Sequence, residues 1–196
     1  MTDILVKGGP VMIPLVLASV AAVGILAERL WFLWRVRRET DRLLEQLNSE
    51  RLPSAEELLT ACRRTWAPVA RVILAAVGGG RQPSLSAAER QGGEEARRLE
   101  GQLPAVDAIV TLAPLLGLLG TILGMIRSFG VLSVQGTDNP FAVTGGIAEA
   151  LITTAAGLIV AVVAFAGYAW CQHAMEREVH RMETTAGDLL ERVRWR

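Results

Sequence analysis

One apolar stretch, residues 141–171, restricts most strongly what this chain can fold into. It reads FAVTGGIAEALITTAAGLIVAVVAFAGYAWC and holds a single side chain that is charged at neutral pH, Glu149. Because about 20 apolar residues cross a bilayer as a helix, the stretch predicts a membrane-spanning helix. It is rich in Gly, Ala and Thr, and small residues let membrane helices approach closely. We therefore expect this helix to face protein more than lipid.

The distribution of charge predicts the rest of the architecture. Hydrophobic residues make up 51% of the chain, and its 20 basic and 20 acidic side chains cancel, so net charge favours no nucleic-acid partner. Most charges lie in residues 35–102 and after residue 171, between and beyond three apolar runs. This pattern predicts an all-α integral membrane protein with three transmembrane helices and long helices that extend into the cytoplasm.

Basic residues beside the spans predict the orientation. Twelve arginines lie in residues 35–102 and five in the tail after residue 171, whereas the N-terminal flank holds only Lys7. The positive-inside rule then places the N-terminus outside, the long connection and the tail in the cytoplasm, and the short connection outside. The predicted parts are an N-terminal segment with the first span (1–34), a cytoplasmic helical loop (35–102), the second span (103–129), a periplasmic turn (130–140), the third span (141–171) and a cytoplasmic amphipathic helix (172–196).

Local signals predict the helices of the loop. Ser54 and Glu57 form a capping box ahead of one helix that runs to about Val77, and Gly78–Pro83 breaks the chain. Ser86 and Glu89 form a second capping box. We expect the helix that follows it to continue into the second span as one long helix, bent at Pro104.

Three further features of the sequence have structural interpretations. Glu28 and Arg29, near the end of the first run, either form an intramembrane ion pair or extend to the membrane boundary. Cys62 and Cys171 have no metal or redox spacing and are expected to be free thiols in a reducing compartment. The first apolar run is too long for the core of a signal peptide, so no cleaved leader is expected.

Small residues in the second and third spans predict close helix packing. Ala113, Gly117 and Thr121 share one face of the second span, and Gly120, Gly124 and Ser128 share another, so close neighbours are expected on both sides. In the third span Gly157 has the same role, and Asn139 with Pro140 predicts where that helix begins. The helix-packing candidates are Gly117, Gly120, Gly124 and Gly157.

Polar side chains inside the apolar runs are the candidates for function. An intramembrane acid such as Glu149 is costly and is by default a functional candidate. Thr153 lies one turn after it and is able to donate a hydrogen bond, and helix depth places Thr121 and Thr154 near one level. Thr111 is an accessory polar candidate. A few hydroxyls, water and one titratable group suit a proton relay, whereas a channel for large solutes needs more polar wall.

The tail predicts contact with other helices. Its apolar residues follow a heptad-like spacing with charges between them, which is typical of a narrow coiled-coil seam. The seam either joins copies of the chain or packs on the chain's own cytoplasmic helices. Its residues are Met175, Val179, Met182, Ala186, Leu189 and Val193.

The motifs PLLGLLGTILGMIRSF and GGIAEALITTAAGLIVA closely resemble the MotA/TolQ/ExbB proton-channel family, and the three-span layout is similar to its ExbB/TolQ branch. The resemblance implies a pentamer around a pore that holds the single helices of ExbD- or TolR-like partners, each with a protonatable Asp. Proton flow would drive work on a TonB- or TolA-like protein at the bacterial inner membrane. By the motifs, the pore residues would be Thr121, Glu149 and Thr154.

Other classes of function find less support in the sequence. A non-conducting scaffold around a partner helix is the main alternative, with Glu149 as a fixed hydrogen-bond site between subunits. A membrane enzyme lacks support, because the sequence shows no His/Cys/Asp cluster, nucleophile elbow or phosphate loop. We therefore expect no enzyme activity, no catalytic residue, no metal and no cofactor.

Overall fold

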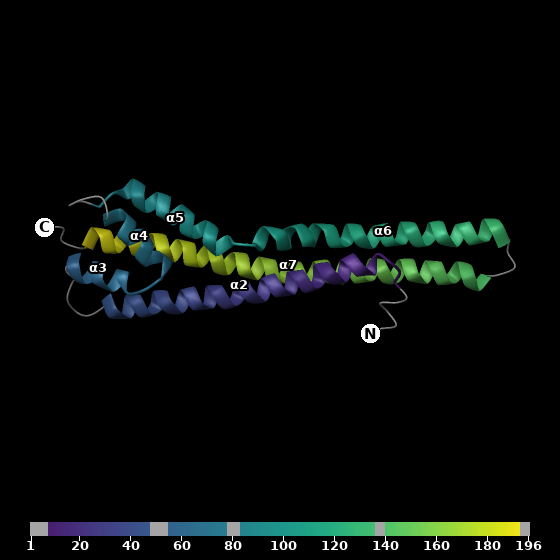
Figure 1. Ribbon diagram of the computed structural model, residues 1–196, viewed down its shortest axis with the longest axis horizontal. Helices are drawn as coiled ribbons and strands as arrows, with labels where there is room; N and C mark the ends of the chain where they lie inside the picture. Colours follow the sequence, from purple (N-terminus) through teal and green to yellow (C-terminus); the bar gives the residue numbers. More distant parts are fainter. Residues whose placement is uncertain (1–7, 48–54, 78–82, 136–139, 193–196) are drawn as a thin grey trace. The chain divides into compact units, whose positions relative to one another are not determined.

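The computed structural model describes residues 8–47, 55–77, 83–135 and 140–192, and nearly all of them are helical (Figure 1). No strand occurs within these ranges. The helices are α2 (Met12–Leu47), α3 (Ala55–Arg63), α4 (Pro68–Val77), α5 (Leu85–Glu100), α6 (Leu103–Gln135) and α7 (Pro140–Arg192).

Three of these helices are long and apolar enough to cross a membrane. The candidate spans are Met12–Gln46, Leu103–Gly130 and Thr144–Asp188. The predicted all-α membrane fold with three spanning helices is therefore confirmed. The predicted orientation, with the N-terminus outside, stays a prediction.

Several helices run further than their hydropathy indicated. α2 continues past residue 34 to Leu47, and α7 joins the predicted third span and the tail into one helix. α6 continues to Gln135, so the turn predicted for 130–140 begins with six helical residues. Charged residues end an apolar run without ending a helix, because only Gly, Pro or a competing cap interrupts the backbone hydrogen bonds. The predicted cap residues Ser54 and Asn139, and the breaker residues 78–82, lie outside the described residues. The cap predicted at Ser86 is wrong, because Ser84 caps α5 and its hydroxyl accepts the Ala87 N–H.

The single helix predicted up to Val77 is wrong, because residues 64–67 separate α3 from α4. Pro68 has no N–H to donate, and its ring disfavours a helical conformation at Ala67. The Thr65 hydroxyl accepts the Ala67 N–H at 3.2 Å, which stabilises the turn before α4.

The continuous helix predicted from the loop into the second span is also wrong. α5 ends at Gly101, whose φ of 53° lies in the left-handed region that favours glycine. The Gly101 N–H still donates to the Arg97 carbonyl at 3.1 Å, which closes the last turn. α6 then begins at Leu103, so Pro104 sits in its first turn, where proline needs no hydrogen-bond partner.

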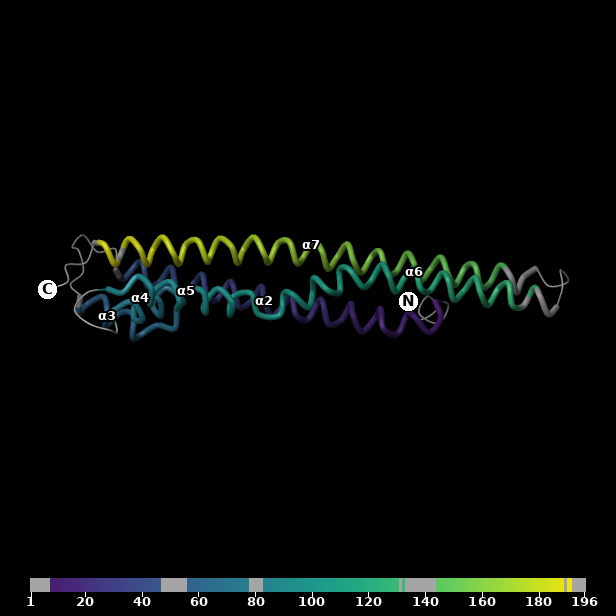
Figure 2. Tube along the Cα trace, turned by 90° about the horizontal axis from the view of Figure 1, so that it is seen from above, coloured from purple at the N-terminus to yellow at the C-terminus, as the bar shows by residue number. Residues whose placement is uncertain are grey.

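Contacts divide the chain into two compact units. Unit 1 comprises Met1–Ala27 and Gln102–Ala169, and unit 2 comprises Glu28–Gly101 and Trp170–Arg196. In unit 1, α6 and the first part of α7 run side by side in opposite directions (Figure 2). The start of α2 packs on both through Val11, Met12 and Leu15, which contact Ala113 and Ala161.

The buried small residues of α6 form one stripe toward α7. The close neighbour expected on a second face of α6 stays a prediction. A Cβ on Gly157 would lie 2.5 Å from the Ala113 carbonyl oxygen, and one on Gly124 would lie 2.8 Å from the Ala150 Cβ. The two predicted arrays merge because their residues are spaced three and four apart on one helix face. The buried stripe consists of Ala113, Gly117, Gly120, Gly124 and Ser128.

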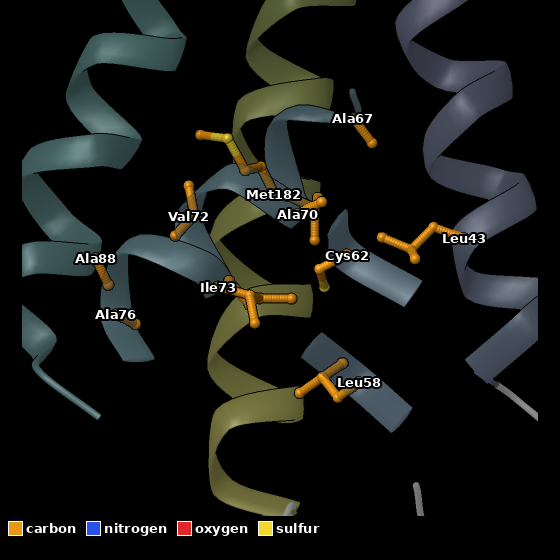
Figure 3. Close-up of a cluster of buried hydrophobic side chains, with 12 residues drawn as sticks. Leu43, Leu58, Cys62, Ala67, Ala70, Val72, Ile73, Ala76, Ala88 and Met182 are labelled. Carbon is orange, nitrogen blue, oxygen red and sulfur yellow. The ribbon is translucent and has the colours of Figure 1, made fainter. Parts of the chain in front are cut away.

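Unit 2 has its own hydrophobic core, built by α3 and α4 against α2, α5 and α7 (Figure 3). Leu58, Cys62 and Ile73 are fully buried there, and Leu43 of α2 and Met182 of α7 point into the same cluster. Burial raises the pKa of the Cys62 thiol to about 11.

The heptad seam of the tail packs on helices of its own chain. Met182 and Ala186 belong to the core around α4, and Met175 and Val179 pack against Leu99 and its neighbours on α2. This is one of the two arrangements that the heptads allowed, and the seam's role between copies of the chain stays a prediction. Val193 and the Leu189 side chain lie outside the described residues.

Candidate functional site

Thr154 is the candidate pore residue that joins the two glycine-rich helices. Its hydroxyl donates to the Gly117 carbonyl of α6 at 2.9 Å. Most membrane threonines satisfy themselves on their own helix, so a bond between helices sets this one apart. The contact is possible because Gly117 has no side chain: a Cβ there would lie 3.1 Å from the Thr154 Cα.

The two candidate threonines of α6 donate to carbonyls of their own helix. Thr121 donates to the Leu118 carbonyl at 2.6 Å, and Thr111 donates to the Asp107 carbonyl at 3.3 Å. Thr121 lies one turn, about 6 Å, beyond Gly117 along α6, so Thr121 and Thr154 stand near the same level of unit 1. This is the depth relationship that helix geometry suggested from the sequence.

Glu149 is paired within its own chain, which the sequence analysis missed. Arg127 Nη1 of α6 lies 2.9 Å from Glu149 Oε1 of α7, and the two side chains are 52% and 27% exposed. Arg127 appeared in the sequence only as the end of a span. The small-residue pattern held the signal, because pairing Gly124 with Ala150 in an antiparallel register brings residues 127 and 149 together.

Thr153 is buried, with 1% of its surface exposed, and binds backbone rather than the acid's side chain. Its hydroxyl lies 2.9 Å from the Glu149 carbonyl oxygen and 2.6 Å from the Gly8 carbonyl oxygen. Gly9 follows with φ of 70°, and a Cβ there would overlap Glu149 Oε1. Gly8 and Gly9 therefore lie against the third span, a contact between distant parts of the sequence that no local pattern indicates.

These residues form a sparse polar path in an apolar surrounding. One carboxylate, one guanidinium and four threonine hydroxyls stand on α6 and α7, while large apolar side chains such as Leu118, Ile122 and Leu151 are exposed around them. Among the described residues, no group of three or more His, Cys, Asp or Glu side chains is placed to hold a metal ion. The chemistry this arrangement suits is the binding and transfer of a proton or a small cation.

Comparison with known proteins shows the family of the chain. The family model described as the MotA/TolQ/ExbB proton channel family matches residues 67–184. An ExbB-like biopolymer transport protein of Synechocystis is 37% identical over 172 residues, which cover 83% of this chain and 66% of that protein. The biopolymer transport protein ExbB of Salmonella typhimurium is 30% identical over 207 residues, which cover 97% of this chain and 81% of that protein.

A shorter match links the chain to a second system. The Tol-Pal system protein TolQ of Pseudomonas aeruginosa is 39% identical over 74 residues, which cover 38% of this chain and 32% of that protein. The fold and these matches define a membrane protein of the proton-channel class. The chain belongs to the MotA/TolQ/ExbB proton channel family, in its ExbB/TolQ branch, as the two motifs predicted. It spans about two thirds of the length of the Synechocystis relative.

Proposed function

We propose that this protein is the proton-conducting stator subunit of an energy-coupling complex in the bacterial inner membrane. Several copies, a pentamer by family resemblance, surround the single helices of ExbD- or TolR-like subunits. Proton flow through the complex is converted into mechanical work on a TonB- or TolA-like protein. The observation that carries the proposal is the grouping of Thr121, Thr154 and Glu149 at neighbouring levels of two apolar helices.

The chemistry of the group favours protons over larger solutes. A hydrated ion or an organic solute needs a wall of polar groups, and the large side chains exposed on α6 and α7 between residues 112 and 170 are mainly Leu, Ile, Val and Phe. One acid per chain does not make a full path, so the partner's Asp completes it. The protein itself turns over no substrate and needs no cofactor.

A second candidate function has one observation in its favour. Because Glu149 is already paired with Arg127, its carboxylate suits a fixed structural role in a non-conducting scaffold around the partner helix. In that case the partner carries every proton. Arg127 then serves only to hold α6 against α7.

Two measurements test the proposal. Native mass spectrometry of the full chain, alone and co-expressed with an ExbD/TolR-like partner, should show a pentamer that gains two partner copies. A monomer or dimer that ignores the partner would refute the stator architecture. Proton flux into proteoliposomes should fall to background for Glu149→Ala with the complex intact, whereas unchanged flux would favour the scaffold.

The predicted topology is a separate part of the proposal. The N-terminus and the connection after α6 lie in the periplasm, and the arginine-rich loop and tail lie in the cytoplasm. Cysteine accessibility supplies the test: a cysteine introduced at Thr137, in the sequence between α6 and α7, should react with an impermeant maleimide from outside the cell. Labelling only after the inner membrane is permeabilised would reverse the topology.

A further inference from the structure

Two adjoining cavities in unit 2 share aromatic and arginine walls. The first has a volume of 310 Å³, and its lining includes Arg29 and Phe32 of α2, Trp66, Arg71 of α4 and Arg98 of α5. The second has a volume of 300 Å³ and shares Phe32, Trp66 and Arg71 with the first. The proton path described above uses none of these residues.

Arg29 is the most enclosed of the arginines and keeps one donor without a partner. Its Nη1 donates to the Arg98 carbonyl at 3.2 Å, and its Nη2 lies 3.2 Å from Glu28 Oε1. Its Nε is buried and has no hydrogen-bond partner among the described residues. A buried donor of this kind is rare in proteins and marks a position where an acceptor belongs.

The backbone around Arg29 is shaped to hold the guanidinium. Gly101 lies directly against it, and a Cβ at that position would overlap the guanidinium carbon. The Phe32 ring stands 5.4 Å from the same carbon and supports it from another side. Arg29 is therefore held in place rather than free to extend into solvent.

The charge of the cavities favours an anion. Arg29, Arg35, Arg71 and Arg98 face two acids, Glu28 and Glu95, which leaves a net charge of +2. Glu95 is 2% exposed and is engaged by Arg71 at 3.1 Å and by Arg98 at 3.0 Å, which fixes both cations beside the cavity. A guanidinium group is planar and carries several N–H donors, so it suits phosphate oxygens particularly well.

The position of the lining residues in the sequence indicates which anion lies near the cavities. The apolar run of α2 ends immediately before Glu28, and Trp31 and Trp34 follow, as is typical of a membrane–water interface. Basic pockets at this depth are a common way to bind acidic lipid headgroups. We propose that this pair of cavities binds the phosphate group of an anionic phospholipid, with Arg29 and Arg71 as its main ligands and Trp66 against the glycerol portion.

The test uses the full chain in detergent and three probes: dioctanoyl-phosphatidylglycerol, dioctanoyl-phosphatidylcholine and sodium phosphate. Native mass spectrometry measures bound lipid and its Kd. Phosphatidylglycerol should bind with a Kd about fivefold lower than phosphatidylcholine. Arg29→Gln should remove that preference, whereas Arg90→Gln, which deletes an exposed arginine of α5 outside the cavity lining, should keep it.

Further outcomes decide between explanations. Equal phosphatidylglycerol binding by Arg29→Gln and Arg90→Gln would overturn the proposal. If Arg29→Gln fails to fold, Arg29→Lys decides the matter. Lysine keeps the charge but lacks the guanidinium Nε, so the Kd for phosphatidylglycerol should still rise. An unchanged Kd would count against the site. Sodium phosphate that binds alone and displaces the lipid would assign the cavities to free phosphate and refute the lipid assignment. Proton flux plays no part in these readouts.

Discussion

Arg127 Nη1 and Glu149 Oε1 lie 2.9 Å apart, so the acid of the third span meets a cation of the second span within one chain. The pair links α6 to α7 at the level between two close glycine contacts, Gly124 with Ala150 and Gly146 with Ser128. A charged acid in an apolar helix is thereby neutralised by its own subunit.

The ion pair predicts coupling between two substitutions. Arg127→Gln and Glu149→Gln should each lower the thermal stability of the detergent-solubilised protein. The double variant should lose less stability than the sum of the two single losses. Because both side chains are partly exposed, we expect a coupling energy of about 0.5–1 kcal/mol in a double-mutant cycle. Strict additivity of the two single effects would show that the pair contributes nothing.

The threonines predict a graded effect on energy coupling. Thr154→Val removes a hydroxyl that joins α7 to α6, whereas Thr111→Val removes one that bonds only its own helix. The two substitutions are matched in shape, so Thr154→Val should reduce proton flux clearly more than Thr111→Val. Flux in proteoliposomes measures this, and equal mild losses would mean that the pore face is misassigned.

Helix packing in unit 1 predicts intolerance of a methyl group at Gly157. A Cβ there meets backbone atoms of Ala113 and Gly117, which cannot rotate away. Gly157→Ala should therefore cost about 1–3 kcal/mol by overpacking, measured as thermal unfolding by circular dichroism. Gly145→Ala on the same helix is the control, because a Cβ there meets nothing within 4 Å. A Gly157→Ala variant as stable as this control would contradict the packing.

Burial of Cys62 predicts slow thiol chemistry with a definite pH dependence. With its pKa raised to about 11 from 9.0, the thiol of the folded protein stays protonated where an ordinary cysteine ionises. At pH 8 the thiolate fraction is about 0.1% instead of about 10%. In a Cys171→Ser background, maleimide should label the folded protein at least about a hundredfold more slowly than the denatured protein. Equal rates would show that Cys62 is accessible.

The same raised pKa has a consequence for stability. The folded state favours the protonated thiol. The stability that the protonated Cys62 thiol contributes is fully present below pH 9.0 and is lost as pH rises from 9.0 toward 11. Cys62→Ala should remove this part of the alkaline dependence. A thermal melt series across that pH range compares the two proteins, and identical slopes would contradict the assignment.

The burial of Glu95 predicts that replacing it lowers the stability of the protein, whereas replacing the neighbouring Glu94 does not. Its buried carboxylate accepts hydrogen bonds from Arg71, Arg98 and Gln91, so Glu95→Gln should destabilise the protein by about 1–3 kcal/mol. Glu94→Gln changes charge equally at an exposed position and should cost little. Equal melting temperatures for the two variants would contradict this role.

Local patterns were sufficient for the fold class, the three spans and the family. The length of an apolar run determines whether a helix can cross a bilayer, and no tertiary contact is needed to recognise it. The GLLGT and GIAEAL motifs identified the family in the same way. Helix ends were harder, because the break before Pro68 and the turn at Gly101 depend on backbone hydrogen bonds that hydropathy does not report.

The sequence by itself determined the composition of this protein's polar path: one acid and a few hydroxyls in helices rich in glycine. Only the tertiary structure decided how those groups are partnered. Glu149 meets Arg127, Thr154 meets the Gly117 carbonyl, and Thr153 meets Gly8 because antiparallel helices and the segment before α2 bring distant residues together. Spacing along one helix defines a face, but the partner of that face depends on packing between helices.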